Sequence, residues 1–148
     1  MHAMNYVKSA CAYTCKIKLA PNAIMPKLAT PESAGYDLQT PSDFVIKAKD
    51  SCIVDLRIKI QLPSGIYAKI ENHSKMTMLK HRIVVAGGIV DNDHDGSLQV
   101  VLFNHGKKSR HFKRGDKIAQ MILKKYCIVP FSRINEFDFE LKYDDTYV

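Results

Sequence analysis

Three aspartates at alternate positions, Asp91, Asp93 and Asp95, lie in a segment that opens with two glycines and closes with Gly96. Like charges this close repel each other, and a cation or a metal-bound phosphate would relieve the repulsion. The spacing matches the start of an EF-hand calcium loop. That loop, however, needs flanking helices and a bidentate Glu at the position where this chain has Leu102. Two readings remain open: a polar hairpin turn, and a catalytic hairpin in which one aspartate is a general base.

The elements that must position this hairpin are short alternating strands. From Cys52 to Leu62 every second residue is apolar, which predicts one strand with a buried face and a wet face. Similar patterns predict strands over 16–20, 43–47, 66–70, 83–86, 98–103 and 118–129, and one after the turn at 30–38. Strands of this kind, with turns about every ten residues, indicate an all-β barrel or sandwich. Only Ser74 to His81 could form a helix, of one or two turns.

Composition places the chain among ordinary globular proteins. Its 148 residues suffice for one domain with a real core, and 46% of them are apolar and 25% charged. No apolar run approaches the length of a membrane span, and the first residues lack the apolar core of a signal peptide. We therefore expect an intracellular, non-secreted protein without a membrane segment. Four cysteines without a paired CxxC pattern predict reduced thiols.

The formal net charge of +7 is unevenly distributed, with a concentration in residues 107–114 and a second cluster that includes Lys75, Lys80 and Arg82. A solvated basic loop is the favoured reading of residues 107–114. Nucleic acid is a less favoured partner, because no aromatic stripe accompanies the charges. A third reading is that these charges attract a small polyanion.

Taken in order, five groups of residues resemble the motifs of the trimeric dUTPase family. They are Lys16–Leu19 with Pro21–Ala23, Ala34–Leu38, Gly88–Asp93 with Gly96, Val100–Asn104, and Gly115–Gln120. The resemblance covers residues 16–131 and leaves an N-terminal arm, 1–15, and a C-terminal arm, 132–148. It implies a distorted β-barrel or jelly roll with at most one short helix, assembled as a homotrimer with active sites shared between subunits.

The resemblance also implies a reaction, the hydrolysis of dUTP to dUMP and pyrophosphate. Asp91 would be the base that deprotonates a water in line with the α-phosphate. Mg²⁺ would be held chiefly by the phosphates and water, and Asp37 would assist through a metal-bound water. The alternative for Asp37 is an aspartate that caps a turn.

Further residues are expected at the substrate by the same resemblance. Gly88, Ile89 and Val90 would form the slot for uracil and deoxyribose, and His94 replaces the tyrosine that usually forms the wall under the sugar. Gln120 would support the hairpin or contact phosphate; otherwise it is simply a polar residue on a strand.

The chain departs from the family in two places. The second motif, usually Pro-Arg-Ser-Gly, corresponds to residues 72–75, although counting back from Asp91 shifts this register by one residue. Ser74 would keep the hydroxyl that meets the leaving phosphate, His73 replaces the arginine, and Lys75 would supply a point charge. The glycine-rich arm that should close over the nucleotide is not found before Val148.

These departures favour an alternative function: a catalytically impaired dUTPase-fold protein that acts as an interaction or signalling adaptor. The final Thr146-Tyr147-Val148 has the Thr-x-Val form that PDZ domains bind, although three residues also match by chance. Removal of Val148 would test that partner.

Overall fold

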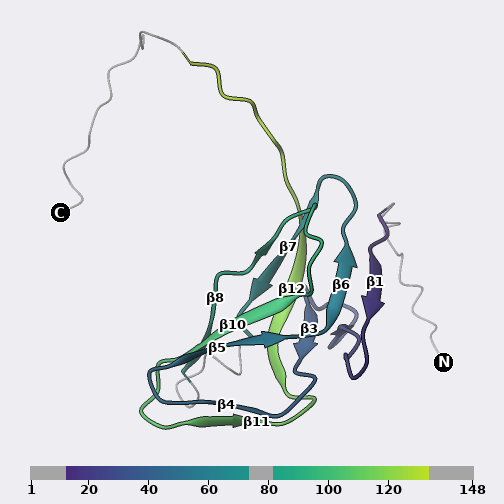
Figure 1. Cartoon of the computed structure of the whole chain (residues 1–148). Helices are drawn as coiled ribbons and strands as arrows, with labels where there is room; N and C mark the ends of the chain where they lie inside the picture. The colour runs from purple at the N-terminus through teal and green to yellow at the C-terminus, as the bar shows by residue number, and fades with distance from the viewer. Residues whose placement is uncertain (1–12, 74–81, 134–148) are drawn as a thin grey trace.

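The computed structural model describes residues 13–73 and 82–133, and within them the chain forms strands and no helix. The strands are β1 (Lys16–Leu19), β2 (Lys27–Leu28), β3 (Tyr36–Gln39), β4 (Phe44–Ile46), β5 (Ser51–Asp55), β6 (Ile58–Gln61), β7 (Ile66–Glu71), β8 (Ile83–Ala86), β9 (Ile89–Val90), β10 (Gln99–Asn104), β11 (Arg110–Phe112) and β12 (Lys117–Lys125). The predicted all-β, jelly-roll-like fold is confirmed (Figure 1). None of the described residues forms a helix that could span a membrane.

A five-stranded sheet in the order β2-β3-β12-β7-β9 carries most of the residues of interest. The central strand β12 pairs with β3 through its first half and with β7 through its second half. Three smaller sheets complete the fold, namely β5-β10-β8, the ribbon β1-β6 and the ribbon β11-β4. Apolar residues at alternate positions of these strands are buried in one core cluster, which includes Leu38, Leu56, Ile58, Leu102 and Ile118.

The predicted single strand from Cys52 to Leu62 is wrong, because the chain turns in its middle. β5 pairs with β10 and β6 pairs with β1, and Arg57 between them has a φ of 59°. The carboxylate of Asp55 accepts a hydrogen bond from the Arg57 backbone N–H at 2.7 Å, which stabilises this left-handed residue. Leu56 and Ile58 are nevertheless buried, so the alternation correctly predicted which residues enter the core.

The predicted solvated basic loop at residues 107–114 is correct only in part. Lys107, Lys108, Lys113 and Arg114 are exposed and lie outside strands, but residues 110–112 form β11. This strand pairs with β4, and the Phe112 ring is buried and stacks on Phe44 with centroids 4.6 Å apart. Figure 1 shows the two strands as a separate ribbon at the lower end of the molecule. The aromatic pair gives this charged segment an apolar inner face, and that favours a strand over a solvated loop. The last predicted strand is shorter than expected, since β12 ends at Lys125 rather than near Val129.

Three predictions fall outside the described residues. They concern the helix at Ser74 to His81, most of the N-terminal arm and most of the C-terminal arm.

Candidate active site

The hairpin starts from two glycines whose backbones most side chains would not tolerate. Gly87 has a φ of 78° and Gly88 a φ of 123°. A Cβ on Gly88 would lie 2.3 Å from the carbonyl oxygen of Ile70, and the Gly88 carbonyl accepts a hydrogen bond from the Ile70 N–H at 2.6 Å. Only glycine allows this close approach, which fixes the start of β9 against β7.

The predicted slot residues Ile89 and Val90 form β9, which pairs with β7 on one side. The Val90 side chain is buried in the core, whereas Ile89 is exposed. Among the described strands β9 lies at the edge of its sheet. An edge strand presents backbone N–H and C=O groups in a row, and such groups are suited to reading the polar edge of a planar base.

The turn after β9 holds Asp91 at the surface. The Asp91 carbonyl accepts a hydrogen bond from the His94 N–H at 3.2 Å, and the Asn92 amide donates to the carbonyls of Leu62 and Pro63 at 3.0 and 2.7 Å. Asn92 therefore attaches the hairpin to the turn between β6 and β7. It is a positioning residue that the sequence did not single out, because a polar residue in a turn needs no further explanation.

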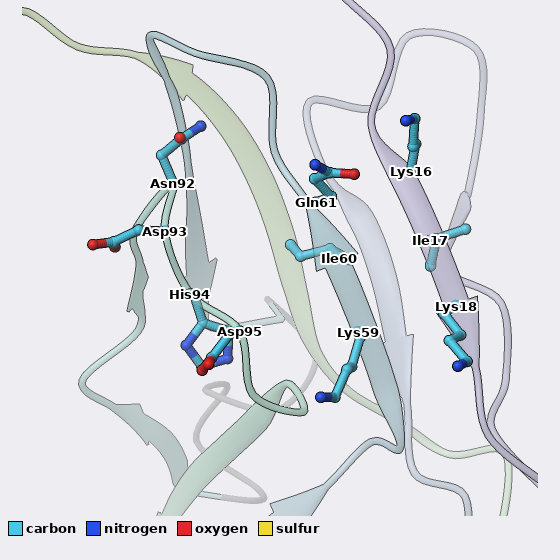
Figure 2. Close-up of a pocket in the computed structure, with 10 residues that line it drawn as sticks. All are labelled: Lys16, Ile17, Lys18, Lys59, Ile60, Gln61, Asn92, Asp93, His94 and Asp95. Atoms are coloured by element: carbon cyan, nitrogen blue, oxygen red, sulfur yellow. The ribbon is translucent and has the colours of Figure 1, made fainter.

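Asp91 and His94 face different hollows of the surface. Asp91 and Ile89 line a pocket with the rings of Tyr67 and Tyr126. His94 lines another pocket, in which the hairpin faces lysines of the β1-β6 ribbon (Figure 2). Asn92 and Asp93 border both pockets. Asp91 thus shares a pocket with Ile89, whereas His94 lines a different pocket although its backbone is hydrogen-bonded to that of Asp91.

A second polar group lies on the outer face of the five-stranded sheet, around Asp37 and Gln120. These residues are directly opposite each other on β3 and β12. The Gln120 amide donates to the Asn72 carbonyl at 3.0 Å, and the Asn72 side-chain oxygen accepts from the Val85 N–H at 2.6 Å. The segment that carries the altered second motif is therefore attached to the sheet at Gln120.

Asp37 is buried and is contacted by two basic side chains. Lys117 Nζ lies 2.6 Å from Asp37 Oδ2, and His73 Nε2 lies 3.5 Å from Asp37 Oδ1. His73 Nδ1 is also buried, without a hydrogen-bond partner. The histidine that the resemblance aligns with the family's arginine thus contacts the residue expected at the metal-bound water.

Lys117 was not predicted as a site residue, and a β-bulge explains why. Strict alternation would place residue 117 on the same face as Ala119, which is in the core. The register between β12 and β3 shifts between Lys117 and Ala119, and both Ile118 and Ala119 are buried. The extra residue puts Lys117 opposite Gln39, on the face that carries Asp37 and Gln120.

The described residues do not fit a magnesium ion held by side chains. Both carboxylate oxygens of Asp37 face basic nitrogens, and within residues 13–73 and 82–133 no three His, Cys, Asp or Glu residues gather as metal ligands would. Mg²⁺ prefers several oxygen ligands. The Lys117 ammonium lies 2.6 Å from Asp37 Oδ2 and competes with a metal ion for the negative charge of that carboxylate.

The hairpin group and the sheet group do not meet within one chain. Across the sheet, β9 lies three strands from β3. Along the sheet, the register places Asp91 opposite Tyr67, and the β7 residue in line with Asp37 is four positions further along that strand. At about 4.8 Å per strand and 3.3 Å per residue, the separation is roughly 20 Å in a flat sheet. A general base must reach its proton within hydrogen-bond distance, so one chain cannot bring both groups to one phosphate.

The other predicted site residues, Ser74 and Lys75, and the C-terminal Thr146-Tyr147-Val148 lie outside the described residues.

The fold and these two groups define a jelly-roll-like β protein with a carboxylate-bearing hairpin at a sheet edge and a polar group on the sheet face. The protein-family model of dUTPase matches residues 21–144. The chain belongs to the dUTPase family.

Curated relatives carry the same name across distant organisms. The deoxyuridine 5'-triphosphate nucleotidohydrolase of Oryza sativa is 35% identical over 121 residues, which span 82% of this chain and 70% of the relative. The Mus musculus protein is 34% identical over 122 residues, 82% of this chain and 75% of its own length. A protein of fowl adenovirus A is 34% identical over 120 residues, 81% and 67% of the two chains.

Solved structures show the same fold at lower identity. The dUTPase from phage phi11 of S. aureus has a TM-score of 0.78 at 19% identity and covers 84% of this chain and 98% of its own. Another structure of a phi11 dUTPase has a TM-score of 0.77 at 19% identity and covers 85% of this chain and 99% of its own. It was reported for the coordination of a structural Mg(II) ion in that protein.

Proposed function

We propose that the protein hydrolyses dUTP to dUMP and pyrophosphate. The observation that carries this proposal is Asp91, an exposed carboxylate on a turn that glycines and Asn92 hold beside the open edge of β9. The dUTPase names of relatives at about 35% identity support the same substrate.

In the proposed mechanism Asp91 accepts a proton from a water that attacks the α-phosphorus. The new bond joins the water oxygen to the α-phosphorus, and the bond to the oxygen that bridges the α- and β-phosphates breaks. Pyrophosphate then leaves with that bridging oxygen. Backbone groups of β9 would read the uracil edge, where donors and acceptors are exchanged relative to cytosine. His94 would form the wall under the sugar.

Magnesium enters this proposal as part of the substrate. A triphosphate binds Mg²⁺ through its own oxygens, and Mg²⁺ keeps several of its waters in such complexes. The residues described around Asp37 would then contact the complex without holding the metal, and Gln120 would contact phosphate. Ser74 and Lys75 keep their proposed roles at the leaving phosphates.

The proposed active unit is a homotrimer with sites shared between subunits. It is supported by the separation of the Asp91 hairpin from the Asp37 group, because a neighbouring copy could bring the second group to the first. A homotrimer closes three equivalent head-to-tail contacts of this kind.

The test is pyrophosphate release from dUTP with magnesium, measured for wild type and Asp91→Asn. We expect the substitution to lower turnover by roughly 10²- to 10⁴-fold, as for loss of a general base. Asp50→Asn, the same charge change at an exposed turn, is the matched control and should keep wild-type turnover. Equal turnover in wild type and Asp91→Asn would refute the role of Asp91, and preferential hydrolysis of another nucleotide would refute the substrate.

A second candidate function is binding without turnover, on the same fold. Two observations favour it. His73 stands where the resemblance expects an arginine, and Lys117 forms an ion pair with Asp37. A folded protein that binds a non-hydrolysable dUTP analogue but releases no pyrophosphate would support this alternative.

A further inference from the structure

The β4-β11 ribbon has two ends, and carboxylates balance the basic residues at only one of them. At the end that leads into β12, the Asp43 carboxylate pairs with Lys113 Nζ at 2.8 Å and accepts a hydrogen bond from the Arg114 N–H at 2.8 Å. The Asp116 carboxylate accepts a further hydrogen bond from the Lys113 N–H at 2.8 Å. Acidic residues therefore accompany the basic residues of this turn.

The opposite end of the ribbon carries three lysines on two turns. Lys47 follows β4, and Lys107 and Lys108 come shortly before β11. All three are exposed, and none of them forms an ion pair with a carboxylate in residues 13–73 or 82–133. We refer to these three lysines as the basic end.

The buried side chain of Asn104 holds the two turns together. Its nitrogen donates to the carbonyls of Lys47 and Lys108 at 3.0 and 2.9 Å. Lys49 adds a bond between the turns, because its ammonium donates to the His105 carbonyl at 2.8 Å. The lysines of the basic end thus come from segments that are far apart in the sequence but are fixed next to each other by their backbones.

Acidic residues do not offset the charge of the basic end. In the two turns, residues 47–50 and 105–109, Asp50 is the only acid, and its carboxylate accepts a hydrogen bond from the next backbone N–H at 2.8 Å. Arg82 adds another exposed basic residue beside them, since its carbonyl accepts a hydrogen bond from the His105 N–H at 2.9 Å. The surplus of positive charge favours an anionic partner.

Exposed lysines on two turns suit a polymer of phosphates better than one small anion. Each ammonium is a point charge on a flexible stem, and it does not by itself define a small anion site. A nucleic acid presents phosphates at close intervals, about one charge per 1.7 Å of duplex axis, so separate lysines can contact it together. Contacts to this backbone need positive charge but no aromatic side chains. The missing aromatic stripe therefore argues against base stacking and not against backbone binding.

The same turns lack the side chains of a membrane-binding surface. Residues 47–50 and 105–109 contain no large apolar residue. A segment that lies in a membrane interface places such side chains among the acyl chains while its lysines face the headgroups. Of the two polyanionic surfaces, nucleic acid fits the basic end better.

We propose that Lys47, Lys107 and Lys108 bind the phosphate backbone of a nucleic acid without reading its sequence. These lysines line neither pocket of the hairpin. The register of the ribbon also places them at the end opposite to the one that leads into β12. The proposed surface is therefore separate from the candidate active site, and its role does not depend on dUTP hydrolysis.

The first experiment measures the affinity for a fluorescently labelled DNA duplex of mixed sequence by anisotropy, in EDTA and at several salt concentrations. The triple variant Lys47→Gln, Lys107→Gln, Lys108→Gln should raise the Kd about tenfold or more at low salt. The slope of log Kobs against log[salt] should become shallower by about 3, one unit for each lost phosphate contact. Single-stranded DNA and RNA of the same length, which share the phosphate chemistry, show which form binds most tightly.

The matched control removes three other exposed lysines. Lys16, Lys18 and Lys59 lie on the β1-β6 ribbon and line the same pocket as Asp93 and Asp95 (Figure 2). Their replacement by glutamine changes the net charge equally, but carboxylates already accompany these lysines. We expect the Kd to rise less than about threefold, because charges away from the bound duplex are screened. Equal losses of affinity in the two triple variants would overturn the proposal, because net charge alone would then explain binding.

Two further measurements test what binds and where. Vesicles of phosphatidylcholine and phosphatidylserine should show no binding that depends on the basic end, and such binding without lysine-dependent DNA affinity would overturn the proposal. An excess of a non-hydrolysable dUTP analogue should leave the Kd for DNA unchanged. Competition between the two would place DNA at the candidate active site and would also overturn it. If the triple variant does not fold, Lys107→Gln with Lys108→Gln replaces it, with an expected slope change of about 2.

Discussion

Gly88 is the residue at which the hairpin tolerates the least change. In Gly88→Ala the new Cβ would meet the Ile70 carbonyl oxygen, whereas in Gly87→Ala it would meet nothing within 4 Å. Both positions have positive φ, so both substitutions strain the backbone, by about 1–2 kcal/mol. We predict that Gly88→Ala lowers the free energy of unfolding by about 1–3 kcal/mol more than Gly87→Ala does. Urea unfolding of the two variants measures this, and equal losses would contradict the close approach of β9 to β7 at Gly88.

At the level of single residues, motifs predict candidate site residues but not their contacts. Asp37, Asp91 and Gln120 are predicted in this way, and the structure adds that Asp37 and Gln120 lie opposite each other. Lys117 could not be found, because a bulge reverses its face and a period of two residues cannot reveal that. The resemblance implied active sites shared between subunits, but it did not say which group each copy would contribute. The separation of the two groups depends on strand order, which local patterns do not encode.

The break between β5 and β6 shows what alternation predicts at the level of an element. Alternation predicts which residues are buried, and it was correct for Leu56 and Ile58. It does not predict where the chain changes sheets, because a left-handed residue such as Arg57 leaves no mark in the hydrophobic pattern. The break depends instead on a local hydrogen bond from Arg57 to Asp55.

This break is predicted to make a pH-dependent contribution to stability. A hydrogen bond from the Ser97 hydroxyl, followed by that from the Arg57 N–H, holds the pKa of Asp55 below its ordinary value. A lowered folded-state pKa stabilises the fold above the unfolded-state pKa, and this contribution is lost as pH falls through the folded-state pKa. Because Asp55 is exposed, we expect Asp55→Asn to cost no more than about 1 kcal/mol at pH 7.

The measurement is the free energy of unfolding of wild type and Asp55→Asn between pH 7 and pH 2.5. The difference should be constant down to about pH 4 and should shrink below it. Ser97→Ala removes the main donor and should show the same trend. A difference that grows as pH falls would contradict the sign.

The β4-β11 ribbon depends on one buried amide. Asn104 is fully buried, and its side-chain nitrogen donates to the carbonyls of Ile46, Lys47 and Lys108 at 2.9–3.2 Å. Asn104→Ala leaves these carbonyls without that donor and should cost about 2–4 kcal/mol in the free energy of unfolding. Gln99→Ala, at the exposed start of the same strand, should cost less than about 0.5 kcal/mol. Similar losses in both variants would show that the ribbon does not depend on the amide.

At the scale of the whole molecule, the separation of the two groups predicts complementation between inactive subunits. Asp91→Asn removes the hairpin carboxylate and Gln120→Ala alters the sheet group, and each variant alone should have little turnover. If each site combines the hairpin of one copy with the sheet group of another, random 1:1 mixing restores both groups in about a quarter of the sites.

The measurement is pyrophosphate release after the two variants are unfolded, mixed and refolded together. Separately refolded samples, mixed afterwards, are the control. Activity of the co-refolded sample that does not exceed the control would show that the sites are not shared in this way.

The central place of β12 has a consequence for synthesis of the chain. β12 pairs with both β3 and β7 but follows them in sequence, so the five-stranded sheet cannot close until its last strand has been made. At about 5–20 residues per second, several seconds pass between translation of β3 and that of β12. During this interval the ribosome-bound chain carries strand edges that have no partner, and long-range pairing of this kind is slow even afterwards. The late synthesis of β12 therefore leaves the nascent chain prone to association. When β12 pairs, it covers the open edges of β3 and β7 and also brings Lys117 and Gln120 into the sheet.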